Sequence, residues 1–269
     1  MAEDKIRHYA KVNGLNMYYQ DHGSGQPLVL IHGGIGNVEM NWGPSIPLFS
    51  KKFRVIAPDS RGHSRTDNPS GEFSYKLMAD DTVALIKELG LVNPIIFGWS
   101  DGGQIVLEIG MNYPGFAKAL IAGGVLSELS DHYLNGMKAF GALGPGKVDF
   151  DLFKKTYPDF ANAMVEMHSP VYGTDYFVDG LFTNITKMWF NPEEFPGDRL
   201  TKIVDPTLVV QGDRDEVIPL EESVRIYRMI PNAELAIIAG ADHGSVSAQA
   251  ERVTNVVLDY IARLEKKPE

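Results

Sequence analysis

The sequence predicts an α/β fold in which a mostly parallel central sheet carries helices on both faces. Short apolar runs alternate with longer amphipathic stretches along the first half of the chain. Several of these runs are apolar almost throughout, which is typical of strands buried on both faces of a parallel sheet. The order strand, helix, strand, helix, strand then implies right-handed crossovers between parallel neighbours.

The individual elements follow from the periodicity of the apolar residues. Strands are predicted at 15–21, 27–33, 53–59, 93–99, 117–124, 205–213 and 233–240. Residues 74–90 predict a helix, because apolar positions recur near a 3.6-residue spacing and Gly90 supplies a stop. Further helices are expected directly after Ser100, at 220–231 and at 250–267.

The alternation of strands and helices is interrupted between residues 126 and 202. This stretch contains helical segments but no strong strand candidate, and a buried strand resumes only after it. We therefore expect an α/β core formed by residues 1–125 and 203–269, with residues 126–202 inserted as a helical cap.

Composition excludes several classes of partner and site. The formal charge of −10, without a cluster of Lys and Arg, argues against nucleic acid and anionic membranes as partners. The absence of cysteine excludes disulfides, thiolate metal sites and a cysteine nucleophile. Neither a signal-peptide core nor a run of about 18 apolar residues is present. We expect a cytoplasmic protein without a metal or cofactor, and the sequence leaves monomer and homodimer open.

The segment FGWSDGG, residues 97–103, contains the candidate nucleophile. Gly98-Trp99-Ser100-Asp101-Gly102 matches G-x-S-x-G, in which the serine occupies a tight turn between a strand and a helix. The pattern alone is weak evidence, but a predicted strand precedes it and a predicted helix follows it. Placed there, Ser100 would lie at the carboxyl end of the sheet, near free N–H groups of a helix N-terminus.

A serine hydroxyl needs a base within hydrogen-bond reach and a carboxylate that orients the base. Of the seven histidines, His243 follows the last predicted strand and so lies at the same edge of the sheet as Ser100. Asp213, Asp215 and Glu216 all follow the preceding strand. Asp213 is expected to cap the turn, so we assign the acid to Asp215.

An oxyanion hole requires two N–H donors. We assign the backbone N–H groups of Asp101 and Gly34, the latter in the glycine-rich loop 30–37. Ile35 is the alternative to Gly34, because the doubled glycine leaves the register of the loop open.

These motifs together resemble the α/β-hydrolase superfamily, in its group of compact esterases, lactonases and cofactor-free haloperoxidases with a helical cap. The matching elements are HGG at 32–34, APDSRGHSRTD at 57–67, GWSDGG at 98–103, GDRDEVIP at 212–219 and GADHG at 240–244. The chain order serine, aspartate, histidine is the order of this fold. Members that are epoxide hydrolases or dehalogenases carry aspartate as nucleophile, so Ser100 points to acyl chemistry.

The expected reaction is hydrolysis of a carboxylic ester or lactone through an acyl-serine intermediate. The cap is rich in aromatic residues and methionine, which favours a neutral and largely apolar acyl group. The candidate substrate-binding residues are Trp42, Trp99, Met188 and Trp189. The chain length, the modest cap and the GWSDGG turn are similar to those of acyl-homoserine lactone hydrolysing esterases and enol-lactone hydrolases.

Three alternatives remain open at this point. The first is a carbon–carbon bond hydrolase of dienoic ketones, which shares the three catalytic residue types. The second is a cofactor-free perhydrolase or haloperoxidase activity. The third is a ligand receptor on the hydrolase fold, which would show slow turnover and tight binding.

Overall fold

The computed structural model describes residues 6–266, so residues 1–5 and 267–269 of the predicted core lie outside the described residues. One eight-stranded sheet has the order β1-β2-β4-β3-β5-β6-β9-β10. Its strands are β1 (Arg7–Val12), β2 (Leu15–Gly23), β3 (Gln26–Ile31), β4 (Phe53–Pro58), β5 (Ile95–Trp99), β6 (Ala119–Gly123), β9 (Thr207–Gly212) and β10 (Ala233–Ile238). β2 is antiparallel to β1 and β4, and the other neighbours are parallel. The prediction of a mostly parallel sheet is confirmed.

β1 lies outside the predicted strands. It forms one edge of the sheet, and its side chains are mostly exposed or half-buried, so it lacks an apolar run. Asn13 and Gly14 join it to β2 with positive φ angles of 48° and 79°. Asn-Gly between two strands is a strong signal for a two-residue hairpin, so the turn could have revealed this strand.

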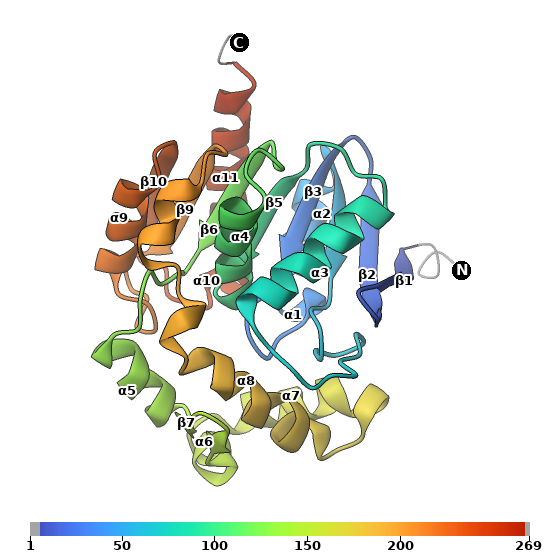
Figure 1. Ribbon diagram of the computed structural model, residues 1–269, viewed down its shortest axis with the longest axis vertical. Helices are drawn as coiled ribbons and strands as arrows, with labels where there is room; N and C mark the ends of the chain where they lie inside the picture. Colours follow the sequence, from blue (N-terminus) through green and yellow to red (C-terminus); the bar gives the residue numbers. More distant parts are fainter. Residues whose placement is uncertain (1–5, 267–269) are drawn as a thin grey trace.

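Helices cover both faces of the sheet (Figure 1). One face carries α3 (Tyr75–Glu88), α4 (Asp101–Asn112) and α9 (Leu220–Met229). The other carries α1 (Val38–Trp42), α2 (Ile46–Phe49), α10 (Ser245–Ala248) and α11 (Ala250–Leu264). Strand side chains alternate between two buried clusters, so that Ile96 of β5 packs on the α4 side and Phe97 packs on the α11 side.

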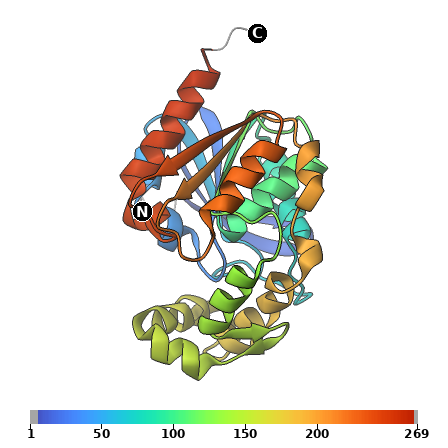
Figure 2. The ribbon, with the colours of Figure 1, turned by 90° about the vertical axis from the view of Figure 1, so that its left-hand side faces the viewer.

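The inserted segment forms a separate lobe below one end of the sheet (Figure 2). Its helices are α5 (Asp131–Ala139), α6 (Phe150–Thr156), α7 (Pro158–Tyr172) and α8 (Thr183–Trp189), with a π-helix η2 (Phe177–Phe182) and 3₁₀ turns η3 (Pro192–Glu194) and η4 (Gly197–Lys202). It also contains a short hairpin, β7 (Ala142–Gly144) and β8 (Lys147–Val148), which the apolar pattern does not predict because each strand is so short.

Within residues 6–266, no helix has both the length and the apolar character required to span a bilayer.

Candidate active site

Ser100 occupies a sharp turn between β5 and α4. Its φ of 57° and ψ of −123° fall in a region that residues other than glycine rarely adopt. The flanking glycines allow this turn. A Cβ atom at Gly98 would lie 2.0 Å from the oxygen of Gly102, and one at Gly102 would lie 2.2 Å from the oxygen of Ile31. The two glycines of the motif are therefore required by the close approach of three backbone segments.

The structure brings Ser100, His243 and Asp215 together. His243 Nε2 lies 3.0 Å from Ser100 Oγ, and His243 Nδ1 lies 2.8 Å from Asp215 Oδ2. The three residues follow β5, β10 and β9, whose carboxyl ends share one edge of the sheet. With a proton on Nδ1 held by the carboxylate, Nε2 presents a lone pair to the serine hydroxyl.

Asp215 is fixed by its own loop. Its Oδ1 accepts hydrogen bonds from the N–H groups of Val217 and Ile218, both at 2.9 Å, which leaves Oδ2 for His243. The Asp215 side chain is almost fully buried. Asp213 instead accepts a hydrogen bond from the N–H of Gly240, in the loop after β10, and so connects the two loops and does not cap its own turn.

Two backbone N–H groups near Ser100 are free. The N–H groups of Gly34 and Asp101 have no hydrogen-bond partner among the described residues. The N–H of Ile35 is bonded to His63 Nε2 at 3.2 Å. The alternative of Ile35 as oxyanion donor is therefore wrong for this conformation, because its N–H is already occupied, and Gly34 is the loop residue whose N–H is available.

The side chain of Asp101 is a buried carboxylate that sequence reasoning missed. Tyr75 Oη donates to Oδ1 and Trp189 Nε1 donates to Oδ2, each at 2.8 Å. Burial raises the pKa of Asp101 from 3.8 to about 6, and the two hydrogen bonds partly oppose this shift. The carboxylate thus connects α4, α3 and the cap helix α8. No sequence motif pointed to Tyr75 as its partner.

A cavity of about 200 Å³ opens onto Ser100 and lies between core and cap. Its lining is mainly apolar and aromatic, and consists of Gly34, Ile35, Ser100, Asp101, Tyr133, Met137, Phe140, Phe160, Trp189, Val217 and His243. The predicted substrate-binding residue Trp189 is part of this lining. It comes from α8, so the cap supplies a wall of the cavity.

The structure contradicts the placement of the other three predicted substrate-binding residues. Trp99 follows the alternation of β5 and points with Phe97 to the α11 side of the sheet, away from the cavity. Trp42 is fully buried on that same side, with its ring centroid 4.7 Å from that of Phe97. Met188 is buried in the α4-side cluster, one position before Trp189, and does not line the cavity. All three side chains are buried outside the cavity.

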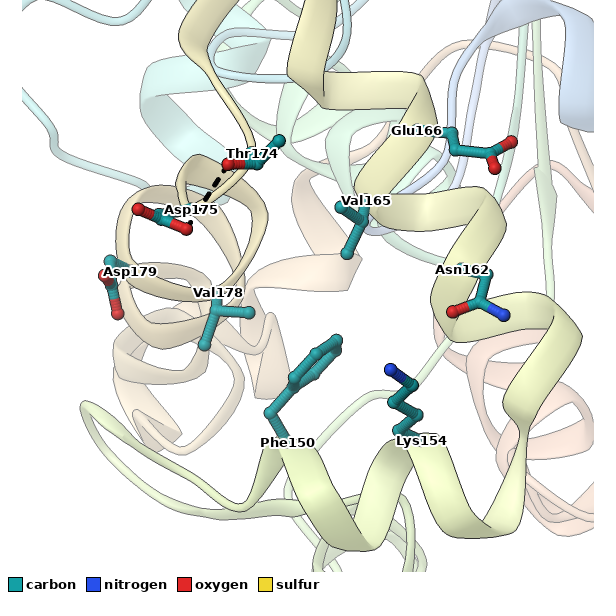
Figure 3. A pocket seen from close by; sticks show the side chains of 9 residues that line it. All are labelled: Phe150, Lys154, Asn162, Val165, Glu166, Thr174, Asp175, Val178 and Asp179. Atoms are coloured by element: carbon teal, nitrogen blue, oxygen red, sulfur yellow. Dashed lines mark hydrogen bonds between the residues drawn. The ribbon is translucent and has the colours of Figure 1, made fainter.

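A second, larger hollow lies on the cap surface between α6, α7 and η2 (Figure 3). Its volume is about 590 Å³, and it shares no lining residue with the cavity at Ser100. Lys154 faces a lining that also contains three carboxylates, Glu166, Asp175 and Asp179. Across residues 6–266, no group of three or more histidine and acidic side chains is placed to hold a metal ion.

Comparison with known proteins identifies the family. The model of the alpha/beta hydrolase fold family matches residues 26–247. The chain belongs to the α/β-hydrolase fold family. This match spans β3 to α10 and includes the inserted cap, the serine turn and the histidine loop.

Individual relatives of this hydrolase differ in the reaction that their names state. A putative non-heme chloroperoxidase of Synechocystis is 28% identical, with 92% of this chain and 95% of that protein covered. A 2-hydroxy-6-oxo-6-(2'-aminophenyl)hexa-2,4-dienoic acid hydrolase of Metapseudomonas resinovorans is 26% identical, with 96% and 91% covered. The crystal structure of a meta-cleavage product hydrolase from Pseudomonas fluorescens superposes with a TM-score of 0.81 at 23% identity, covering 96% and 98% of the two chains. The last likeness shows the fold alone.

Proposed function

We propose that this protein is a serine hydrolase that cleaves carboxylic esters or lactones through an acyl-serine intermediate. The observation that carries the proposal is the hydrogen-bonded series from Asp215 through His243 to Ser100 beside two free N–H groups. Among the described residues that line the cavity, no other pair consists of a nucleophile hydrogen-bonded to a base.

The chemical steps follow from this geometry. His243 Nε2 takes the Ser100 proton as Oγ attacks the substrate carbonyl, and the resulting oxyanion receives hydrogen bonds from the N–H groups of Gly34 and Asp101. His243 then returns the proton to the leaving alcohol, which departs as the C–O bond breaks. A water molecule, deprotonated by His243, hydrolyses the acyl-serine and releases the acid. For a lactone the leaving alcohol remains attached to the acid.

The cavity supports an uncharged and compact acyl group. Its volume of about 200 Å³ lies below the range of roughly 300–1,000 Å³ usual for sites that hold drug-sized ligands. Its described lining contains no Lys or Arg, and the buried carboxylate of Asp101 disfavours an anionic substrate. A short acyl chain or a single ring fits this space better than a long chain, and this includes short-chain acyl-homoserine lactones.

The same lining favours ester over carbon–carbon bond hydrolysis. The relative named above as a hydrolase of a dienoic acid acts on a carboxylic acid, which is anionic at neutral pH. A binding site for such a substrate calls for a cation to pair with the carboxylate, and the described lining of the cavity contains no Lys or Arg.

A substrate panel tests the proposal. It compares p-nitrophenyl acetate, butyrate and octanoate with a butyrate analogue that bears a terminal carboxylate and one that bears a terminal ammonium group. It also includes γ-lactones and short-chain acyl-homoserine lactones. We expect turnover of the neutral short esters, and much slower turnover of the octanoate and of the anionic analogue.

Two further assays test the alternatives. Turnover of a dienoic diketone without ester cleavage would overturn the proposal in favour of the carbon–carbon hydrolase. Peracid formation from acetate and peroxide tests the perhydrolase alternative.

A further inference from the structure

We propose that His63 is a positioning residue for the oxyanion hole: by accepting the N–H of Ile35, it holds the loop after β3 so that the N–H of Gly34 faces the substrate carbonyl. This inference rests on the proposed function. His63 itself does not line the cavity and would act through the loop.

The hydrogen bonds of the loop define which N–H is free. Gly33 N–H donates to Asn41 Oδ1 at 2.9 Å, and Ile35 N–H donates to His63 Nε2 at 3.2 Å. Gly34 lies between these two anchored positions. Its Cα is also confined by neighbours, since a Cβ there would lie 2.5 Å from Asp101 Oδ2 and 2.8 Å from the ring of Trp189. The loop is thus fixed on both sides of the proposed donor.

Ile35 makes the anchor necessary. Its φ of 52° lies in the left-handed region, which is unfavourable for a β-branched residue. Such a conformation persists only when its surroundings hold it, and the bond to His63 is its backbone restraint from outside the loop. Without this acceptor, the loop can relax and rotate the peptide plane that carries the N–H of Gly34.

His63 is held in the tautomer that accepts a hydrogen bond. Its Nδ1–H donates to the oxygen of Arg61 at 2.8 Å, which leaves a lone pair on Nε2. Arg61 is anchored in turn by a buried ion pair with Asp81 at 2.6 Å. Burial is the main cause that holds the pKa of His63 well below its ordinary value, and the nearby His32 and His168 add to this effect. The ring therefore stays neutral, as the bond to Ile35 requires.

The test compares His63→Phe, which removes the acceptor, with His63→Gln, whose amide can accept from Ile35 and donate to Arg61. The readouts are kcat and KM on a neutral ester, together with the affinity for a trifluoromethyl ketone and for the matching alcohol. The ketone forms an oxyanion adduct with Ser100 and the alcohol cannot. For His63→Phe we expect kcat and ketone affinity to fall about 10- to 100-fold, while KM and alcohol affinity are unchanged. This is less than the roughly 10²- to 10³-fold loss on removing one oxyanion donor, because the N–H of Gly34 is misplaced and not removed. His63→Gln should recover most of the loss.

A structural role alone would give a different result. Val257→Ala on α11, in the buried cluster on the other face of the sheet, is the control for general destabilisation. If His63→Phe lowers the melting temperature as this control does but keeps kcat per titrated active site, the inference is overturned. Should His63→Phe fail to fold, His63→Leu takes its place. Full activity of either variant also overturns the inference. An inactive wild-type protein would instead contradict the proposed function.

Discussion

The indole Nε1 of Trp99 donates a hydrogen bond to the backbone oxygen of His243 at 2.9 Å, across 144 positions of sequence. Trp99 is the residue before the nucleophile, and this bond connects it to the loop that carries the base. Its ring lies against Gly123, where a Cβ would come within 2.2 Å of it. A residue first predicted to line the substrate cavity instead holds the histidine loop from the other face of the sheet.

Trp99→Phe should therefore reduce turnover without removing any group from the cavity. Phenylalanine keeps an aromatic ring in the core but lacks the N–H that donates to the backbone oxygen of His243. Loss of this hydrogen bond costs about 1 kcal/mol of stability and allows the His243 loop to move. We expect kcat to fall about tenfold with little change in KM, as for a base misplaced by a fraction of an ångström. Steady-state kinetics on a neutral ester measure both values.

Trp42→Phe is the matched control for this variant. Trp42 is equally buried on the same face, and its Nε1 has no hydrogen-bond partner within the described part of the chain. The substitution removes a comparable volume from the core without removing a bond to the histidine loop. Equal losses of kcat in the two variants would show that packing alone explains the effect of Trp99.

Replacing Ser100 should separate chemistry from backbone strain. Ser100→Ala removes the nucleophile and should abolish turnover, but it retains the unfavourable φ of 57°. Ser100→Gly should also be inactive, yet it relieves a strain of about 1–3 kcal/mol against an unfolded-state entropy cost of about 0.4–1 kcal/mol. We expect the glycine variant to be the more stable of the two in chemical denaturation. Substantial esterase activity in either variant would refute the mechanism.

The two aspartates after β9 should differ sharply in their effect on turnover. Asp215→Asn replaces the acceptor of the His243 Nδ1 proton and should lower kcat about 10³- to 10⁴-fold. Asp213→Asn, its neighbour in the same loop, keeps an oxygen that can accept from Gly240 and should leave kcat within about threefold of the wild type. A comparable loss in both variants would contradict the assignment of Asp215 as the acid.

The sequence predicts the sheet and the three interacting site residues well because both depend on local signals. Apolar runs mark the buried strands, and Ser100, Asp215 and His243 each lie in the turn or loop that follows one of them. Since parallel strands end at one edge, adjacency in space follows from position in sequence. The edge strand β1 carries no apolar run and was therefore missed.

The walls of the cavity are harder to predict, because they depend on contacts between distant segments. Trp99 lies next to the nucleophile in the sequence, and Trp189 lies in the cap. Their packing alone decides that Trp189 faces the cavity and that Trp99 does not. The same holds for Asp101, whose carboxylate partners come from α3 and α8. Composition of the cap indicated an apolar site without indicating which side chains form it.

Trp189 should limit the length of the acyl group. Its ring lines the cavity and is fixed by the hydrogen bond to Asp101. Trp189→Leu removes part of this wall, so we expect the ratio of kcat/KM for octanoate over butyrate esters to rise about tenfold or more. Phe160→Leu, a smaller change in the same lining, should shift the ratio less. An unchanged ratio for Trp189→Leu would mean that the acyl chain leaves the cavity in another direction.

The raised pKa of Asp101 should make stability depend on pH in a defined window. The folded-state pKa of Asp101 is about 6 and its ordinary value is 3.8, so between these pH values the folded protein binds a proton that the unfolded chain does not. The contribution to the free energy of unfolding is then fully present below pH 3.8 and is lost as pH rises through about 6. Over this window the loss amounts to about 3 kcal/mol, at 1.36 kcal/mol per pKa unit.

Asp101→Asn tests this assignment, because it removes the titrating group and keeps the shape of the side chain. Its amide oxygen can accept from Trp189, and its amide N–H can donate to Tyr75 Oη, whose hydroxyl can turn to accept. The backbone N–H at this position is unchanged, so turnover should persist. Urea denaturation across the window should show a weaker fall in stability with rising pH for the variant than for the wild type. Parallel profiles for the two proteins would place the pH dependence in other groups.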